Sequence, residues 1–285
     1  MLATVGARAQ TLEPISQLVW RSDLPGFGGW SGLVMDPDGT AFWAVSDRGR
    51  LIRASVLRAQ SGRILSIREE RILPLQSPRG GFLSRFFDDS EGLTRVDNGF
   101  FVSFEGEHRI AYLENPEART RPRPRDPRFE RFGVNSGLEA LATDANGRIL
   151  AIPERSGGSK RPFPVFRWDG IDWEIPYRIP REGDFLPTGA DLGPDGKLYL
   201  LERSFSFLGG FRIRIRRFEL GDQELLEPEV LLIGGSNAYD NAEGISLWRA
   251  PGGEIRLSII SDNNFQPLQR TILSEFRVQE APSRD

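Results

Sequence analysis

Short apolar segments separated by tight turns recur along the chain, and five of them share one layout. Each copy has a small polar residue and a glycine, a short apolar segment, a tight turn, and a second apolar segment that ends in Asp or Glu. The copies begin at Ser31, Ser90, Ser136, Thr188 and Asn241, about 46 to 60 residues apart. A repeat of this length indicates one supersecondary unit that is used five times.

The turns predict that each copy begins with a β-hairpin. They read DPDG (36–39), VDNG (96–99), DANG (144–147), GPDG (193–196) and APGG (250–253). Asp-Gly and Asn-Gly are strong hairpin signals because these residues accept positive φ. The DPDG segment resembles the start of a calcium loop, but it lacks the downstream ligands and the closing Glu of an EF-hand, which favours a turn.

Further strands follow each hairpin, for example the alternating FRIRIRRFEL (211–220) and then EPEVLLIG (227–234). Four strands per repeat are typical of a β-propeller blade, and radial repetition hides the sheet edges. The last copy has only three strands, ending in TILSEFRV (271–278), and ISQLVWRS (15–22) can supply the fourth. We therefore predict one all-β propeller domain over residues 11–280, with five four-stranded blades closed by the N-terminal strand. Six blades are the alternative if residues 50–89 hide another.

Acidic residues recur at the start of the first strand and at the end of the second strand of the copies. The first strand of a propeller blade lines the central channel, and the second runs antiparallel to it, so both acids reach the same mouth. The expected neighbours are Glu91 with Glu105, Glu139 with Glu154, Asp191 with Glu202, and Glu243 with Asp262, with Asp47 added by the first copy. We therefore expect an acidic ring at one end of the channel.

Such a ring needs positive charge, because each ionised carboxylate raises the pKa of its neighbours. Ca²⁺ is one source, since it accepts about six to eight oxygens from carboxylates, carbonyls and Asn side chains. The predicted metal ligands are Asp47, Glu91, Glu139, Asp191, Glu243, Asp262 and Asn263. Arginine is the other source, because Arg48, Arg155 and Arg203 each follow the acid that ends a second strand. The acids could also pair only with arginine and backbone N–H groups, and so hold adjacent blades together.

Composition and charge exclude several other classes of site. The net charge of −3 argues against a general nucleic-acid binder, because a phosphate backbone requires a basic face. The absence of cysteine excludes disulfides, thiolate nucleophiles and Cys-based zinc sites. The single histidine, His108, excludes His-rich metal sites, and no apolar run approaches the roughly 18 residues of a membrane span.

The two ends of the chain carry weaker signals. Ala7, Ala9 and Gln10 form an A-x-A-Q pattern that resembles the end of a secretory signal, although a basic n-region is missing. We expect residues 1–10 to be a signal remnant, residues 281–285 to be a tail, and the protein to be periplasmic or secreted; a frayed N-terminus is the alternative. A closed propeller has no long sheet edge for pairing, so we also expect a monomer.

Four segments together resemble the esterase-like phytase family, whose members have a phytase-like β-propeller domain. They are SEGL, LPTGADLGPDGKLYLLERSFSFLGGFRIRIRRF, NAEGI and LSIISDNNFQPLQRTILSEFRV, and the resemblance extends from about Gly29 to Phe276. It implies a calcium-associated propeller, usually exported, that is grouped with phosphoester or ester hydrolysis. The residues that match its motifs are Glu91, Glu139, Glu154, Glu202, Arg203, Glu243, Asp262, Asn263 and Asn264.

The ring and the resemblance together predict a Ca²⁺-dependent hydrolase of small anionic esters, phosphoesters above all. Ca²⁺ would offset the charge that develops on the substrate oxygen and lower the pKa of a bound water. Glu154 or Glu202 would take the proton of this water, and Arg48, Arg155 and Arg203 would orient the substrate. The alternatives are a calcium-dependent lactonase and a non-catalytic exported propeller that binds a partner and holds a structural ion.

Two segments each allow two interpretations. Residues 118–133, ARTRPRPRDPRFERFG, are rich in Pro and Arg and either grip phosphate groups or form an exposed extended connection inside the second blade. Residues 204–211, SFSFLGGF, directly follow Arg203 and either wall the site or belong to the core. The sequence lacks the G-x-S-x-G motif that is typical of serine hydrolases. A lone surface histidine is more often incidental than a general base.

Overall fold

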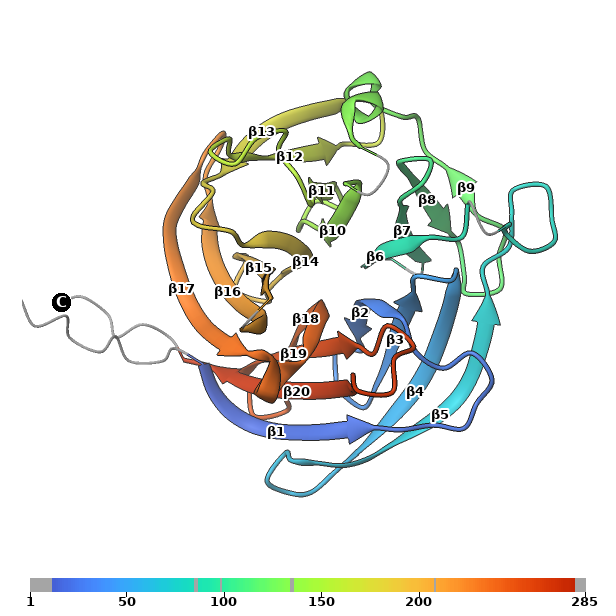
Figure 1. The fold of residues 1–285 in the computed structure, drawn as a ribbon, viewed down its shortest axis with the longest axis vertical. Coiled ribbons are helices and arrows are strands. Elements are labelled where there is room, and N and C mark those ends of the chain that lie inside the picture. The colour runs from blue at the N-terminus through green and yellow to red at the C-terminus, as the bar shows by residue number, and fades with distance from the viewer. Residues whose placement is uncertain (1–11, 85–86, 98, 134–135, 208, 280–285) are drawn as a thin grey trace, which may run out of the picture.

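Five four-stranded antiparallel sheets surround a central axis, which confirms the predicted five-bladed propeller (Figure 1). The computed structural model describes residues 12–84, 87–97, 99–133, 136–207 and 209–279. Blade 1 contains β2 (Trp30–Met35), β3 (Ala41–Ser46), β4 (Arg50–Arg58) and β5 (Ile64–Pro74). Blade 2 contains β6 (Ser90–Val96), β7 (Gly99–Phe104), β8 (Arg109–Leu113) and β9 (Arg121–Pro122). Residues 50–89 therefore supply β4, β5 and a loop, and no sixth blade is formed by the described residues.

The other three blades repeat this order. Blade 3 contains β10 (Leu138–Thr143), β11 (Ile149–Pro153), β12 (Phe163–Trp168) and β13 (Trp173–Ile179). Blade 4 contains β14 (Leu186–Leu192), β15 (Leu198–Ser206), β16 (Gly210–Leu220) and β17 (Leu225–Gly235). Blade 5 contains β18 (Asn241–Arg249), β19 (Ile255–Asp262), β20 (Thr271–Val278) and β1 (Leu12–Trp20). The helices of the described chain are the 3₁₀ helix η1 (Pro127–Arg131) and α1 (Ser236–Tyr239), and neither is long enough to cross a membrane.

The N-terminal strand closes the ring, as the sequence predicts. β1 pairs antiparallel with β20, from Leu12 opposite Val278 to Trp20 opposite Thr271, and so becomes the outermost strand of blade 5. In Figure 1 the first and last parts of the chain lie side by side in this blade. The proposed signal remnant, residues 1–10, and the tail, residues 281–285, lie outside the described residues.

The hydrophobic core lies in layers between neighbouring blades. Tyr199 of blade 4 and Leu257 and Phe276 of blade 5 belong to one buried cluster. Phe42 of blade 1 and Trp248 of blade 5 belong to another. Because each blade packs on two neighbours, the sheets bury both faces, and this explains why the inner strands are continuous apolar segments.

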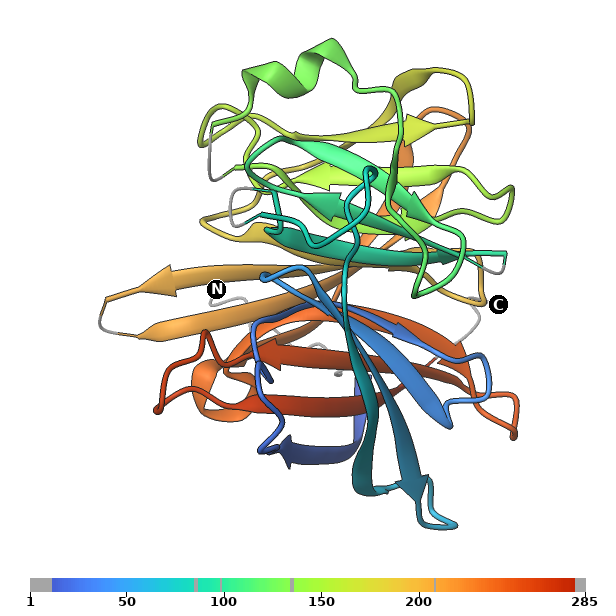
Figure 2. The same cartoon turned by 90° about the vertical axis from the view of Figure 1, so that its right-hand side faces the viewer.

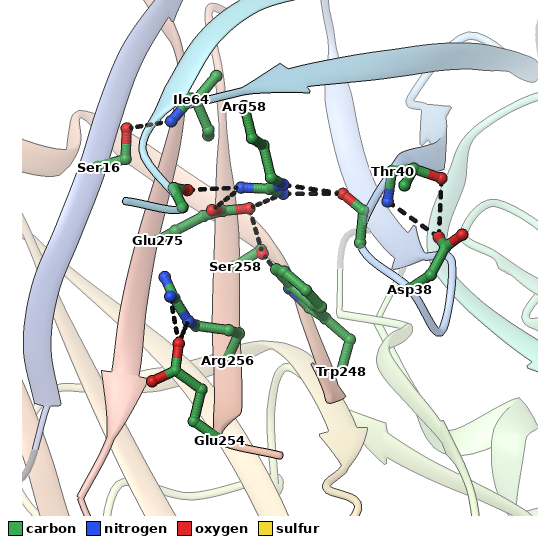
Figure 3. A network of polar contacts seen from close by, with 12 residues as sticks. Ser16, Asp38, Thr40, Arg58, Ile64, Trp248, Glu254, Arg256, Ser258 and Glu275 are labelled. Atoms are coloured by element: carbon green, nitrogen blue, oxygen red, sulfur yellow. Dashed lines mark hydrogen bonds and ion pairs between the residues drawn. The ribbon is translucent and has the colours of Figure 1, made fainter. Parts of the chain in front are cut away.

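A buried ion pair joins blade 1 to blade 5 at the closure (Figure 3). Arg58 at the end of β4 donates bidentately to the carboxylate of Glu275 in β20, with Nη2 2.7 Å from Oε1. The Ser258 hydroxyl donates to the same carboxylate at 3.1 Å, and Trp248 Nε1 donates to Ser258 at 3.0 Å. Glu275 is fully buried, so this network links the blade that contains both chain ends to its neighbour.

The side view separates the two ends of the propeller (Figure 2). The turns between the first and second strand of each blade lie on one side, and the links between the second and third strands lie on the other. The β15–β16 hairpin projects furthest on this second side. Phe205 and Phe207 in this hairpin are exposed, so the tip of the segment does not belong to the core.

Candidate functional site

A β-bulge near the start of every innermost strand aims one side chain at the channel mouth. The residues at these register shifts are Ser31, Glu91, Glu139, Thr188 and Glu243. A bulge leaves its extra residue unpaired and turns the side chain away from the regular alternation of the strand. Three of the five positions hold Glu, so three blades direct a carboxylate to the same place.

A second set of side chains comes from the second strands, one residue beyond the partner of the residue that precedes each bulge. These residues are Asp47, Glu105, Glu154, Arg203 and Asp262. Backbone hydrogen bonds fix three of them, since Asp47 N–H donates to Gly29, Glu105 N–H to Asp89, and Glu154 N–H to Gly137, at 2.8, 2.8 and 3.0 Å. Four blades therefore place an acid at this level, whereas blade 4 places Arg203 there.

All the residues of the two sets except Thr188 line one cavity of about 290 Å³ at the mouth, which we call the acidic cavity. Its lining residues are Ser31, Asp47, Asp89, Glu91, Glu105, Glu139, Glu154, Arg203, Glu243, Asp262 and Asn264. The structure thus brings together five of the seven predicted metal ligands, Asp47, Glu91, Glu139, Glu243 and Asp262, and two of the five predicted catalytic residues, Glu154 and Arg203.

Three carboxylates converge most closely on one wall of the acidic cavity. One oxygen of each of Asp89, Glu91 and Glu105 lies within 4.8 Å of the others. Burial, and then the nearby charges of Glu243, Asp89 and Glu105, raise the pKa of Glu91 well above its usual range. Oxygen-only ligands suit a hard cation such as Ca²⁺. Asp89 was not predicted from the sequence, although the acidic run DDSEG (88–92) points to it.

Two further acids of the cavity, Asp47 and Asp262, also have raised pKa values. Burial, despite the nearby Arg48, raises the pKa of Asp47 to about 7. Burial and the neighbouring Glu243 raise the pKa of Asp262 to about 8. The Asp47 Oδ1 atom is buried and has no hydrogen-bond partner among the described residues. An orphaned carboxylate oxygen beside clustered acids fits a bound cation, which would supply the missing charge.

Arg203 is the one cation among the residues that line the acidic cavity. Its Nη1 donates to Asn241 Oδ1 at 2.7 Å and to the Glu243 carboxylate, and Asn241 Nδ2 donates to the same carboxylate at 2.8 Å. Burial opposes the charge of Arg203, but Glu243, Glu139 and Glu154 outweigh it and raise the pKa of the guanidinium. The cavity therefore has one fixed positive charge, paired with Glu243, among carboxylates from four blades.

Glu202 does not reach the acidic cavity, and its predicted role as a base is not supported. It lies opposite Pro187, one residue before the mouth position, so its side chain points to the other face of the sheet. There its carboxylate accepts hydrogen bonds from Arg214 and Arg216, with Nε–Oε2 distances of 2.7 and 2.8 Å. Glu202 is fully buried between two arginines and stabilises blade 4.

Asp191 is also placed differently from the prediction, and it does not approach Glu202. The residue that matches the other bulges is Thr188, so Asp191 lies three residues further along β14. Its carboxylate accepts hydrogen bonds from Leu247 N–H at 2.7 Å and from Leu192 N–H at 2.8 Å. This carboxylate ties the innermost strands of blades 4 and 5 together, as in the structural alternative.

The remaining candidates lie around the rim. Arg48 stacks on Phe265, with 3.4 Å between its guanidinium carbon and the ring centroid, and lines a neighbouring cavity of about 460 Å³. Arg155 is exposed, and its Nε donates to Glu154 Oε2 at 3.1 Å. Asn263 Oδ1 accepts from the N–H groups of Gly29 and Phe265, whereas Asn264 lines the acidic cavity.

Comparison with protein families supplies the class of the protein. The model of the phytase-like family, described as esterase-like activity of phytase, matches residues 25–265. The chain belongs to this family, as its motifs indicate, and this membership supports a hydrolase or esterase-like function for the propeller. No curated protein matches the sequence.

The solved structures of two enzymes resemble the fold. An exo-β-1,3-galactanase from Phanerochaete chrysosporium has 9% identity and a TM-score of 0.56 over 90% of this chain and 64% of that chain. An α-L-arabinofuranosidase from Podospora anserina has 12% identity and a TM-score of 0.53 over 93% of this chain and 97% of that chain. At these identities the likeness concerns the fold alone.

Proposed function

We propose that the protein is a Ca²⁺-dependent hydrolase that acts on small anionic esters, phosphoesters above all, in the acidic cavity. The observation that carries the proposal is the convergence of Asp89, Glu91 and Glu105 in a cavity whose lining contains the single fixed cation Arg203. Carboxylates and a guanidinium in one cavity can hold a cation and an anion together. Membership of a phytase-like family supports the reaction class.

Asp89, Glu91 and Glu105 are the proposed metal ligands, and Asp47, Glu139, Glu243 and Asp262 line the same cavity. When bound, Ca²⁺ would polarise the substrate oxygen and lower the pKa of a water. The raised pKa of Glu91 is consistent with this role, because a carboxylate crowded by like charges gains most from a cation.

Two further residues act on the substrate in this proposal. Arg203 donates to an oxygen of the anionic ester, because its guanidinium is held at the cavity wall by Asn241 and Glu243. Glu154 lines the cavity but lies outside the cluster of Asp89, Glu91 and Glu105, so we assign it the role of accepting the proton of the attacking water.

The first test is thermal unfolding in calcium-free buffer and during a Ca²⁺ titration. A ligand at 100 times its dissociation constant adds about 2.7 kcal/mol, which means several degrees in midpoint for a chain of this size. We expect this rise in the wild type, a smaller rise in Glu91→Gln, and the wild-type rise in Glu114→Gln, whose exposed carboxylate pairs with Arg121. No shift at any Ca²⁺ concentration would contradict the calcium site.

The second test is turnover in Ca²⁺. We expect hydrolysis of aryl phosphates, and an increase in KM of about tenfold or more for Arg203→Gln with these substrates, since a charge-assisted hydrogen bond contributes about 1.5–3 kcal/mol. Neutral lactones and acetate esters should show no such dependence on Arg203. Calcium binding without turnover of any ester would refute the hydrolase and leave the ion in a structural role.

A further inference from the structure

A second cavity, of about 550 Å³, lies beside β8 and β9 of blade 2 and is lined by four arginines. We call it the arginine pocket, and its cations are Arg79, Arg109, Arg123 and Arg125. Glu107 is the one carboxylate among the described residues that line it. The arginine pocket shares no lining residue with the acidic cavity, so its chemistry is separate from the proposed hydrolysis.

Arg109 is the buried charge of the pocket, with only 7% of its surface exposed. Its guanidinium stacks on Phe104, 3.9 Å from the ring centroid, and its Nη2 donates to the carbonyl of Phe87. The Nη1 group is buried and has no hydrogen-bond partner among the described residues, and Arg109 forms no ion pair with them. A buried guanidinium with a spare donor favours an anionic ligand, because desolvation of a charge is costly without a partner.

Arg123 and Arg125 add charge that is not neutralised. Arg123 Nε is also buried without a partner, and its guanidinium lies 5.0 Å from the Tyr112 ring centroid. Arg125 Nη1 lies 3.6 Å from Glu107 Oε1, and both side chains are exposed, so this ion pair is weak. One carboxylate therefore faces four guanidinium groups, and the pocket keeps a net positive charge.

The Arg- and Pro-rich segment 118–133 is largely exposed and contains β9 of blade 2, and hydrogen bonds hold its first part in place. Thr120 donates its hydroxyl to the Gln76 carbonyl at 2.8 Å, Arg123 N–H donates to Ile110 at 2.8 Å, and Trp173 Nε1 donates to Pro124 at 2.8 Å. These bonds hold Arg123 and Arg125 before a ligand arrives, which lowers the ordering cost of binding.

Apolar side chains complete the lining of the pocket. Phe82 is 76% exposed, and Leu83, Pro78 and Pro122 also line the pocket. An exposed aromatic ring next to arginines suits a ligand with an apolar body and an oxyanion. We propose that the arginine pocket binds an organic anion in which a phosphate or carboxylate group is attached to an apolar group, with the oxyanion on the arginines and the apolar part on Phe82.

The test is calorimetric titration of the calcium-free protein with phenyl phosphate, benzoate and inorganic phosphate. Calcium-free buffer keeps the acidic cavity from attracting anions, so failure of the calcium proposal does not affect the result. We expect saturable binding of phenyl phosphate or benzoate, with the preferred oxyanion read from the comparison. Inorganic phosphate should bind more weakly than phenyl phosphate, and Phe82→Ala should remove this difference.

The double variant Arg123→Gln/Arg125→Gln should lose about tenfold or more in affinity, whereas Arg121→Gln, in the same segment but paired with Glu114, should bind as the wild type does. Both variants replace partly or largely exposed side chains, and their unfolding midpoints, compared with that of the wild type, show whether the fold is kept. Arg79→Gln, at another exposed arginine of the pocket, is a further variant. No saturable binding of either aromatic anion, or equal affinity in the wild type and the double variant, would overturn the proposal. Equal affinity for phenyl phosphate and inorganic phosphate would overturn the assignment of the apolar wall.

Discussion

At the scale of single residues, one position in or directly after each second strand sets the charge that each blade contributes to the acidic cavity. Blades 1, 2, 3 and 5 have Asp47, Glu105, Glu154 and Asp262 at this position, and blade 4 has Arg203. Five acids at this level would have repelled anions from every side. Because blade 4 has arginine instead of an acid, the cavity contains both signs of charge, and it has a place for a cation and a place for an anion.

The raised pKa values of the ring acids predict how stability depends on pH. Asp47 and Asp262 titrate in the folded protein at about 7 and about 8, against about 3.8 in the unfolded chain. Between these values the folded state binds more protons, so the unfolding free energy falls as pH rises from about 4 to about 8 and levels off above. Carboxylates whose pKa is lowered in the folded protein, such as Asp36, change the unfolding free energy only at pH values below this range.

Urea midpoints at pH 5, 6.5 and 8.5 in calcium-free buffer measure this effect. We expect the highest midpoint at pH 5, and a smaller fall with pH in Asp262→Asn, because the amide does not ionise. Saturating Ca²⁺ should flatten the fall, since a cation favours the ionised carboxylates. A midpoint that is constant or rises from pH 5 to 8.5 without calcium would show that the ring acids are ionised and compensated in the folded protein.

At the scale of strands, the sequence specifies the hairpins but not their register at the mouth. Asp-Gly and Asn-Gly turns mark four of the five hairpins, so the number and order of strands follow from local chemistry. A bulge adds one residue and reverses the faces beyond it, and no local signal in the sequence shows where it lies. Glu202 and Asp191 were therefore assigned to the ring, whereas Arg203 and Thr188 occupy the equivalent positions.

Four of the five innermost strands have a glycine directly after the bulge, and each lies so close to a neighbouring strand that it cannot easily be replaced; these are Gly32, Gly92, Gly189 and Gly244. A Cβ atom on Gly92 in β6 would lie 2.7 Å from the backbone oxygen of Glu139 in β10 and 2.8 Å from Ser103 Oγ. We expect Gly92→Ala to destabilise the protein by about 1–3 kcal/mol, because overpacking forces the strands apart. The change should also weaken the calcium response, since Glu91 precedes the glycine.

Urea unfolding of Gly92→Ala against Gly235→Ala tests the close approach. A Cβ atom on Gly235, at the end of β17, would meet nothing within 4 Å, and we expect this control to change the unfolding free energy by no more than about 0.5 kcal/mol. Equal stability of the two variants would mean that the innermost strands can separate without cost.

At the scale of the whole molecule, closure of the ring determines whether five blades behave as one unit. The sequence predicts this closure, because the last repeat is one strand short and the N-terminal segment is a spare strand. It does not predict the pair of Arg58 and Glu275, whose residues are 217 positions apart. Long-range ion pairs leave no periodic trace in a sequence, so only the folded structure reveals which of the many arginines are used in this way.

Glu275 is the residue whose loss should most affect this closure. It is fully buried, and Glu275→Gln would remove the charge that the mostly buried Arg58 needs (Figure 3). Breaking a buried pair by removing one partner costs about 3–5 kcal/mol, because the other charge stays uncompensated. We expect a loss of this size in urea unfolding and a thermal midpoint that is lower by several degrees.

Glu117→Gln is the matched control, because Glu117 pairs with Arg71 at 2.6 Å but both side chains are exposed. An exposed pair contributes about 0–1 kcal/mol, so the control should remain close to the wild type. If Glu275→Gln also costs less than about 1 kcal/mol, water reaches Arg58 and the pair does not fasten the ring. The pairing of β1 with β20 would then carry the closure alone, and blade 5 should exchange its amide hydrogens faster than the other four blades.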